Sequence, residues 1–329
     1  MMRSSLTLLV NAPLEEDQRK RIRDLGVRLL DGLSEESLRV AEVIYTTRIP
    51  FEPRQVPRLR WIQLNTVAVD HILTGAMATT GIRIANVRGA YSVAVAELAV
   101  GAIVALSRRF QSAHSLQLQN RWPDDFTPLK GENCYGKTLS ILGYGSIGRH
   151  LARIVTGMGM RVLACKRCPE RKKDKGFYLP NTGDPEGLFP EEWYGLSNIG
   201  EMLSISDILV ICLPLTPETK GVIGPSELAK LPRNAYLINV GRGEVVAEEP
   251  LLDVLRTRRI AGAALDVFPK EPLPTGSPFW GLPNTIILPH IGSFTREQGH
   301  LAGEVLIENL TRDLSVSPLL NLIDPQRGY

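Results

Sequence analysis

A glycine-rich turn between an apolar run and a helical pattern constrains this chain more than any other stretch. Residues 138–142 end in Gly143-x-Gly145-x-x-Gly148, and apolar residues at helical spacing follow. In such a turn the first glycine permits the tight bend, the second lets the backbone approach a pyrophosphate, and the third lets helix pack on strand. The N–H groups and dipole at the helix start favour an anion. A turn without a ligand is the alternative, but the strand before it and the helix after it favour a dinucleotide site.

Length and composition fit two domains, each with its own core. The chain has 329 residues, of which 43% are hydrophobic. Its net charge of +3 is too small to indicate a nucleic acid or a membrane surface as partner. No apolar run approaches the roughly 18 residues of a membrane span, and residues 6–10 are too short for a signal-peptide core. Four cysteines do not make a disulfide framework. We expect a soluble, cytoplasmic protein.

The first 85 residues alternate strand-like and helical runs. Residues 15–25 are charged, with apolar residues at helical spacing, and predict an exposed helix. Apolar or β-branched runs predict strands at residues 6–11, 42–46, 59–64 and 82–87. Such alternation is typical of a parallel sheet covered by helices. Because this segment has no glycine fingerprint, we expect it to form the second, substrate-facing domain.

One long apolar helix is predicted over residues 91–118, and a polar crossing loop at 117–136 follows it and contains Trp122. A helix this apolar must be buried, either in its own core or against another subunit. We therefore expect a homodimer formed through this helix and the loop after it.

From residue 138 onward the pattern is that of a doubly wound sheet. Strand-like runs lie at residues 138–142, 161–165, 208–213, 235–240, 260–265 and 285–288, with helical patterns such as 248–256 between them. A last helix is predicted at 296–314, and the tail at 318–324 is expected to rejoin the first domain.

Four candidate functional residues follow strands of this second half. Arg242 comes after the run at 235–240, Asp266 ends the run at 260–265 with Glu271 five residues later, and His290 follows the run at 285–288. In open parallel sheets, ligands bind beyond the carboxyl ends of the strands. The sequence therefore predicts that these side chains face one ligand site.

These residue types suit the oxidation of an alcohol or the reverse reduction. A nicotinamide accepts the hydride, and a base must take the hydroxyl proton. His290 suits this role because histidine titrates near working pH, and Glu271 is the candidate carboxylate that fixes its tautomer. Arg242 could bind a substrate carboxylate with two donors and polarise the neighbouring carbonyl. Each residue alone has a plain structural interpretation, but their combination after the fingerprint favours catalysis.

Several stretches between residues 55 and 325 match, in order, the motifs of one family. They read LGYGSIG at 142–148, LPLTPET at 213–219, NVGRG at 239–243, LDVFPKEP at 265–272 and PHIGS at 289–293; Asp70, Ser92 and VAE at 95–97 also match. In these motifs the chain resembles the D-isomer-specific 2-hydroxyacid dehydrogenases. The resemblance implies that Arg242, Glu271 and His290 are the catalytic set. It also implies that Asp266 binds the nicotinamide carboxamide and that backbone N–H groups near Val67 and Ala68 bind the substrate carboxylate.

The resemblance completes the expected fold and the expected site. The fold class is α/β, with two doubly wound parallel-sheet domains: a Rossmann cofactor domain at residues 90–293, and a smaller, flavodoxin-like substrate domain made of 1–89 and 294–329. The family is usually dimeric through the cofactor domain. Substrate contacts are expected from Val67, Ala68 and Arg242. Cofactor contacts are expected from Gly143, Gly145, Ser146, Ile147, Gly148, Lys166, Arg167, Leu213, Pro214, Thr219, Val240, Gly241, Asp266 and Gly292.

Two departures from the family pattern concern the ligands. Ala68 stands where the family usually has glycine, and the connection from residue 166 to 198 is longer than usual. Lys166 holds the place at the end of the second strand where an acid would bind the ribose of NAD. Lys166 and Arg167 would instead offer cations to a 2′-phosphate, so NADP is the favoured cofactor and NAD the alternative.

Other signals are weaker. Cys165-x-x-Cys168 has no second pair to complete four zinc ligands, so no metal is expected. His71, His114, His150 and His300 are expected at the surface.

The leading interpretation is an NAD(P)-dependent enzyme that interconverts a 2-ketoacid and a D-2-hydroxyacid, such as a glyoxylate/hydroxypyruvate-type reductase. The alternatives are a dinucleotide-sensing, corepressor-like binding protein of the same fold and a phosphoglycerate dehydrogenase.

Overall fold

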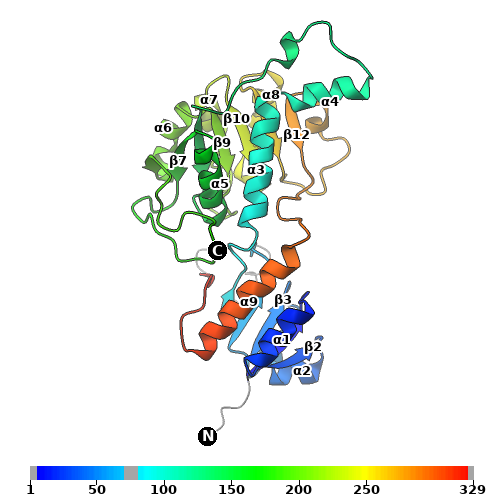
Figure 1. The fold of residues 1–329 in the computed structure, drawn as a ribbon, viewed down its shortest axis with the longest axis vertical. Coiled ribbons are helices and arrows are strands. Elements are labelled where there is room, and N and C mark those ends of the chain that lie inside the picture. Colours follow the sequence, from blue (N-terminus) through cyan, green and yellow to red (C-terminus); the bar gives the residue numbers. More distant parts are fainter. Residues whose placement is uncertain (1–5, 70–80, 325–329) are drawn as a thin grey trace. The chain divides into compact units, whose positions relative to one another are not determined.

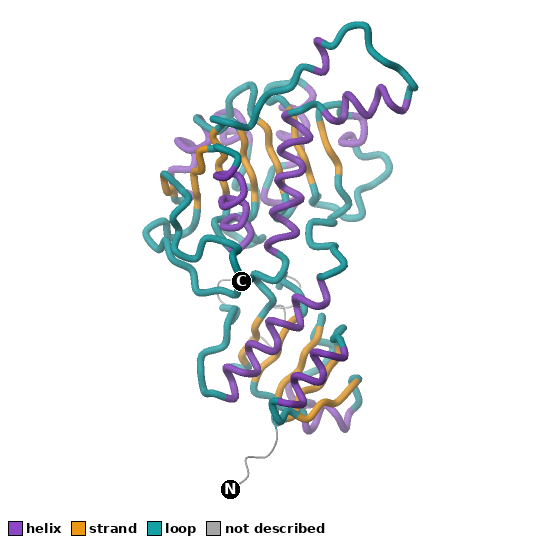
Figure 2. Tube along the Cα trace, in the orientation of Figure 1, coloured by secondary structure: helices purple, strands orange, loops and turns teal. Residues whose placement is uncertain are grey.

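The computed structural model describes residues 6–69 and 81–324, which divide into two compact units. Unit 1 holds the described residues of Met1–Tyr91, Lys175–Leu179 and Phe294–Tyr329, and unit 2 holds Ser92–Asp174 and Pro180–Ser293. Figures 1 and 2 show helices lying over the strands of one sheet in each unit. The predicted class, two α/β domains with parallel sheets, is confirmed.

The sheet of unit 1 has the strand order β2-β1-β3-β4-β5, and all of its strand pairs are parallel. This 2-1-3-4-5 order is that of flavodoxin-like folds, as expected. The strands are β1 (Thr7–Asn11), β2 (Arg28–Asp31), β3 (Val43–Thr46), β4 (Trp61–Leu64) and β5 (Arg83–Ala85), and the helices are α1 (Glu16–Asp24), α2 (Glu35–Val40) and α9 (Gln298–Leu314). The tail bridges Leu322 to Ala85 of β5, so it rejoins unit 1.

Both faces of this sheet are buried, because successive side chains of a strand point to opposite faces. Leu9 of β1 lies in a core with Leu38 of α2, whereas its neighbour Leu8 lies in a second core with Leu306 and Leu310 of α9. Strands covered on both sides by helices are typical of parallel sheets. The apolar runs therefore fold as continuous strands without a polar face.

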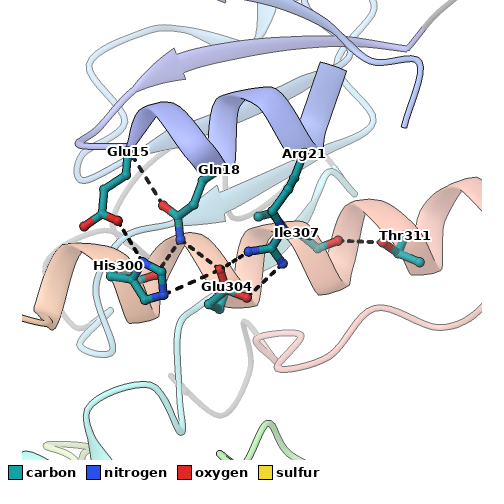
Figure 3. Close-up of polar contacts among 7 residues, drawn as sticks. All are labelled: Glu15, Gln18, Arg21, His300, Glu304, Ile307 and Thr311. Atoms are coloured by element: carbon teal, nitrogen blue, oxygen red, sulfur yellow. Dashed lines mark hydrogen bonds and ion pairs between the residues drawn. The ribbon is translucent and has the colours of Figure 1, made fainter. Parts of the chain in front are cut away.

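Helices α1 and α9 are joined by a polar network (Figure 3). The Gln18 side chain, fully buried, donates to the carbonyl oxygen of His300 and to Glu304, and Arg21 forms two hydrogen bonds with Glu304. A Cβ at Gly303 would lie 2.2 Å from the Gln18 amide, so any larger residue would displace this buried side chain from its hydrogen bonds. The prediction of an exposed helix at 15–25 is thus only partly right, since α1 buries Gln18 and Ile22.

The sheet of unit 2 has the order β12-β11-β10-β9-β6-β7-β8, and every pair is again parallel. Its strands are β6 (Thr138–Leu142), β7 (Arg161–Cys165), β8 (Glu192–Tyr194), β9 (Ile208–Ile211), β10 (Tyr236–Asn239), β11 (Gly262–Leu265) and β12 (Thr285–Ile287). Its helices are α3 (Ser92–Ser107), α4 (Phe110–Leu118), α5 (Ser146–Gly157), α6 (Ile199–Ser204), α7 (Pro225–Lys230) and α8 (Glu248–Arg256). The chain order reverses at β6, between β7 and β9, and ligands bind at such a switch point.

Residues 91–118 form two helices, so the prediction of one long helix is wrong. Helix α3 ends at Ser107, and α4 begins after Arg109, whose φ of +56° lies in the left-handed region. The apolar side of α3 packs with α5 in the core of unit 2, whereas α4 buries none of its residues. The apolar pattern of 91–107 is therefore explained largely by burial within its own unit.

The shorter elements were not predicted. Strands β2 and β8 and helix α2 carry too few apolar residues for periodicity to reveal them, and β8 lies inside the long connection that follows β7. Within residues 6–69 and 81–324, no helix is both long and apolar enough to cross a membrane.

Candidate active site

The glycine turn between β6 and α5 has the geometry of a dinucleotide fingerprint. Gly143 has a φ of +104°, and a Cβ there would lie 2.8 Å from the backbone of Cys212. A Cβ on Gly148 would lie 2.7 Å from the Gly143 carbonyl oxygen, so the third glycine allows α5 to pack closely. By contrast, a Cβ on Gly145 would meet no atom within 4 Å. The space at the N-terminus of α5 thus fits a bound anion.

The other expected cofactor residues follow strands of the same sheet. Lys166 and Arg167 follow β7, Leu213 and Pro214 follow β9, Val240 and Gly241 follow β10, Asp266 follows β11, and Gly292 follows β12. Thr219 donates from its hydroxyl to the Pro214 carbonyl oxygen and accepts from the Thr216 N–H, which closes the turn after β9. Because all seven strands are parallel, these residues belong to one edge of unit 2.

His290 and Glu271 form a direct pair at this edge. Nδ1 of His290 lies 2.6 Å from Oε2 of Glu271, and the other oxygen of Glu271 accepts from the Phe268 N–H at 2.9 Å. An ionised carboxylate can only accept, so the imidazole proton lies on Nδ1 and Nε2 remains to exchange a proton with a substrate. The His290 side chain is 48% exposed. The pairing expected from the sequence is present.

Asp266 holds the backbone that follows His290. Its two carboxylate oxygens accept from the N–H groups of Ile291 and Gly292 at 2.8 and 2.9 Å. Burial raises the pKa of this carboxyl group, and the two backbone N–H groups act in the opposite direction. Hydrogen bonds to a charged group contribute about 1.5–3 kcal/mol each. Asp266 therefore fixes the loop on which His290 lies, in addition to any contact with a nicotinamide.

Arg242 lies in a tight turn after β10. Its Nη1 donates to the Gly241 carbonyl oxygen at 2.7 Å. Asn239, which the sequence analysis did not single out, braces the turn by donating to the Arg242 carbonyl oxygen and accepting from the Gly241 N–H. A Cβ on Gly243 would overlap the Phe268 backbone, at 2.0 Å from its carbonyl carbon. The sequence signal that could have revealed this role of Asn239 is a polar residue at the end of an otherwise apolar run.

The expected substrate loop belongs to unit 1. Val67 and Ala68 follow β4, where Asn86 donates to the Val67 carbonyl oxygen and Thr66 donates to that of Ala68. Val87 also donates from its N–H to Thr66. Asp70 and His71 lie outside the described residues.

A pocket of about 580 Å³ opens beside the ends of β7 and β8. Arg167, Pro169, Trp193 and the turn at 195–198 line it. The ammonium groups of Lys166 and Lys172 lie 6.0 and 5.8 Å from the centre of the Trp193 ring. Lys166 donates to the Arg171 carbonyl oxygen, and Arg167 forms an ion pair with Glu218 at 2.8 Å. Arg167 thus lines the pocket as part of an ion pair, and Lys166 and Lys172 lie near its Trp193 wall.

The Cys165 thiol and one group of potential metal ligands bear on the weaker sequence signals. Burial raises the pKa of the Cys165 thiol to about 12, which disfavours the reactive thiolate. Within the described part of the chain, Glu15, Asp17 and His300 bring three potential metal ligands within 4.8 Å, on an exposed surface of unit 1. There the Glu15 carboxylate, bonded to His300 at 2.8 Å, raises the pKa of that imidazole.

Comparison with known proteins agrees with this geometry. Residues 100–292 match the family described as D-isomer specific 2-hydroxyacid dehydrogenase, NAD binding domain. The chain is 31% identical to a D-3-phosphoglycerate dehydrogenase of Methanocaldococcus jannaschii over 93% of its length, but spans only 57% of that relative. It is also 31% identical to glyoxylate/hydroxypyruvate reductase B of Serratia proteamaculans, with 99% of each chain covered. A D-isomer specific 2-hydroxyacid dehydrogenase of Xanthobacter autotrophicus, solved with NADPH and MES, shares the fold with a TM-score of 0.80 at 25% identity, covering 99% of this chain and 100% of that one. The protein belongs to the D-isomer-specific 2-hydroxyacid dehydrogenase family of oxidoreductases.

Proposed function

We propose that this protein is a 2-ketoacid reductase of the glyoxylate/hydroxypyruvate type, which forms a D-2-hydroxyacid. The observation that carries the proposal is the Glu271–His290 pair at the same sheet edge as Arg242 and the glycine fingerprint. The relative from Serratia proteamaculans, which this chain matches over nearly its whole length, bears the name of that activity. The match to a D-3-phosphoglycerate dehydrogenase keeps that activity as the alternative.

The residues of the site divide the reduction into recognition, polarisation and proton transfer. Bound at the edge of unit 2, a reduced nicotinamide dinucleotide would supply the hydride. The Arg242 guanidinium would bind the substrate carboxylate with two donors and polarise the adjacent carbonyl. Nε2 of His290 would donate the proton to the carbonyl oxygen, while Glu271 holds Nδ1 and stabilises the charged ring. Backbone N–H groups at Val67 and Ala68 would complete the recognition of the carboxylate.

A panel of 2-ketoacids, each offered with NADH and with NADPH, tests the activity at the nicotinamide absorbance band. We expect turnover of glyoxylate or hydroxypyruvate. If neither these ketoacids nor 3-phosphohydroxypyruvate is turned over, a dinucleotide-sensing binding protein is favoured instead. Turnover confined to 3-phosphohydroxypyruvate would identify the phosphoglycerate dehydrogenase.

NADP is the cofactor that Lys166 and Arg167 at the end of β7 support best. An acidic residue at the end of β7, the second strand of the cofactor domain, would repel a 2′-phosphate. This chain has Lys166 there, next to Arg167. We expect kcat/KM to be higher with NADPH than with NADH, and Lys166→Asp to move that ratio toward NADH. Lys20 on α1 of unit 1, whose side chain is 78% exposed, serves as a control, since Lys20→Asp makes the same charge change outside unit 2. A wild-type excess for NADH would contradict the proposal.

A homodimer through α3, α4 and the following loop is part of this proposal. Figure 1 shows α4 and the loop extending away from the sheet of unit 2. Phe110, Leu118, Trp122 and Phe126 are each more than half exposed along this segment. Exposed apolar side chains gathered on one segment mark an interaction surface. Sedimentation velocity at micromolar concentration should give a dimer, and Trp122→Ser should shift it toward monomer; a wild-type monomer would refute the dimer.

A further inference from the structure

The long connection between β7 and β8, residues 166–191, contributes to both units. The chain leaves unit 2 after Asp174, supplies Lys175–Leu179 to unit 1, and returns to unit 2 at Pro180. The chain also changes unit after Tyr91 and after Ser293. Ordered loops of this length in compact domains are usually functional.

The part of the connection in unit 2 is fastened to helix α5. Arg149, fully buried, donates to the carbonyl oxygens of Lys172 and Asp184, and Arg153 donates to that of Gly183. The Gly183 N–H donates in turn to Nδ1 of His150 at 3.1 Å. His150 is 8% exposed, so the expectation of a surface histidine was wrong; burial lowers its pKa, which suits an imidazole that accepts a hydrogen bond.

The same part is also fastened to the glycine fingerprint. Tyr144 lies between the first two glycines of that turn, and its hydroxyl donates to Asp184 at 2.6 Å. The Asp184 carboxylate, 3% exposed, further accepts from the N–H groups of Leu188 and Phe189. One buried carboxylate therefore joins the dinucleotide turn to the part of the connection that follows residues 175–179.

The part in unit 1 shares a buried cluster with the expected substrate loop. Phe177 and Val67 both pack against one buried cluster, formed by Val87, Ala90, Tyr91, Ala302 and Val305. The backbone of Phe177 lies so close to Gly89 that a Cβ there would be 2.0 Å from the Phe177 carbonyl oxygen. Gly89 has a φ of +98°, so glycine is required for its conformation as well. Phe177 thus occupies a fitted position in the support of residues 65–69.

We propose that Phe177, which the connection supplies to unit 1, is a positioning residue that supports the substrate loop and so sets the affinity for the ketoacid. Removing its ring would leave a gap in the cluster that supports Val67 and let the loop shift. The proposal rests on the proposed function, since it assigns the substrate carboxylate to Val67 and Ala68.

Steady-state kinetics of Phe177→Ala and Phe177→Leu test this role. Small misplacements of binding groups have large kinetic effects, so we expect Phe177→Ala to raise the ketoacid KM roughly tenfold or more, with a smaller change in kcat. Phe177→Leu, which refills most of the volume, should restore KM, and the KM for NADPH should stay the same in both. Leu188→Ala is the matched control, because Leu188 lies on the same connection and is 79% exposed.

Amide hydrogen exchange gives a readout that needs no turnover. Phe177→Ala should speed exchange at residues 65–69 and leave residues 143–148 protected as in the wild type. Unchanged exchange at 65–69 would overturn the positioning role of Phe177 whatever the enzyme's activity. A wild-type KM in Phe177→Ala, alongside a wild-type enzyme that turns over ketoacids, would overturn it while leaving the proposed function intact. No turnover by the wild type, with faster exchange at 65–69 in the variant, would overturn the function alone.

Discussion

His290→Ala is expected to lose most of kcat while the affinity for the dinucleotide stays nearly unchanged. Proton transfer by a positioned side chain typically contributes about 10²–10⁴-fold, and His290 is held for that task by its 2.6 Å hydrogen bond to Glu271. Its loop is fixed separately by Asp266, whose bonds to the backbone of Ile291 and Gly292 do not involve the imidazole. The alanine variant should therefore keep the fold of this edge and lose the proton donor.

The measurement is kcat with saturating ketoacid, together with the dissociation constant of NADPH from protein fluorescence. His300→Ala is the control, because His300 is a partly exposed histidine on α9 that is likewise bonded to a glutamate. Wild-type turnover in His290→Ala would show that this imidazole is not the proton donor. A large loss in His300→Ala would point instead to a general effect of losing a histidine.

Arg242→Ala should impair both binding and chemistry. The guanidinium is expected to hold the substrate carboxylate and to polarise the carbonyl, and each charge-assisted hydrogen bond is worth about 1.5–3 kcal/mol. Two such bonds correspond to a fall in kcat/KM of roughly 10²-fold or more, with KM raised and kcat lowered. Arg242→Lys should keep the charge but lose the fork of donors, and so give an intermediate value.

Kinetics with the best ketoacid of the panel check this expectation. Arg256→Ala on helix α8 is the matched control, since Arg256 is exposed and pairs only loosely with Asp253, at 3.9 Å. Wild-type kcat and KM in Arg242→Ala would show that Arg242 has only a structural role in the turn that Asn239 stabilises.

Much of this architecture could be predicted because the strongest signals were local. The apolar run before Gly143 and the helical spacing after Gly148 specify one βα unit, and the same alternation repeats through the chain. The pairing of Glu271 with His290 followed from chemical need, since a histidine that moves protons must have a fixed tautomer. Because Glu271 and His290 follow neighbouring strands and match chemically, few other pairings were available to this histidine.

The features that escaped prediction depend on contacts between distant residues. The break at Arg109 has no proline or glycine to announce it, and its left-handed conformation is unusual for a residue with a side chain. The burial of His150 and Gln18 depends on partners 33 and 282 positions away, Gly183 and His300. The passage of Lys175–Leu179 into unit 1 likewise leaves no periodic pattern in the sequence.

The membership of Lys175–Leu179 in unit 1 changes how this enzyme could be recombined with its relatives. An exchange of substrate domains designed at Tyr91 and Ser293 alone would leave the resident Phe177 facing a foreign Gly89. A chimera should therefore carry a third transplanted piece, residues 175–179, although these are encoded in the middle of the dinucleotide-binding half. Natural substitutions at Phe177 and in the cluster around Val87 should accordingly have been inherited together, as a pair of mutually fitted surfaces.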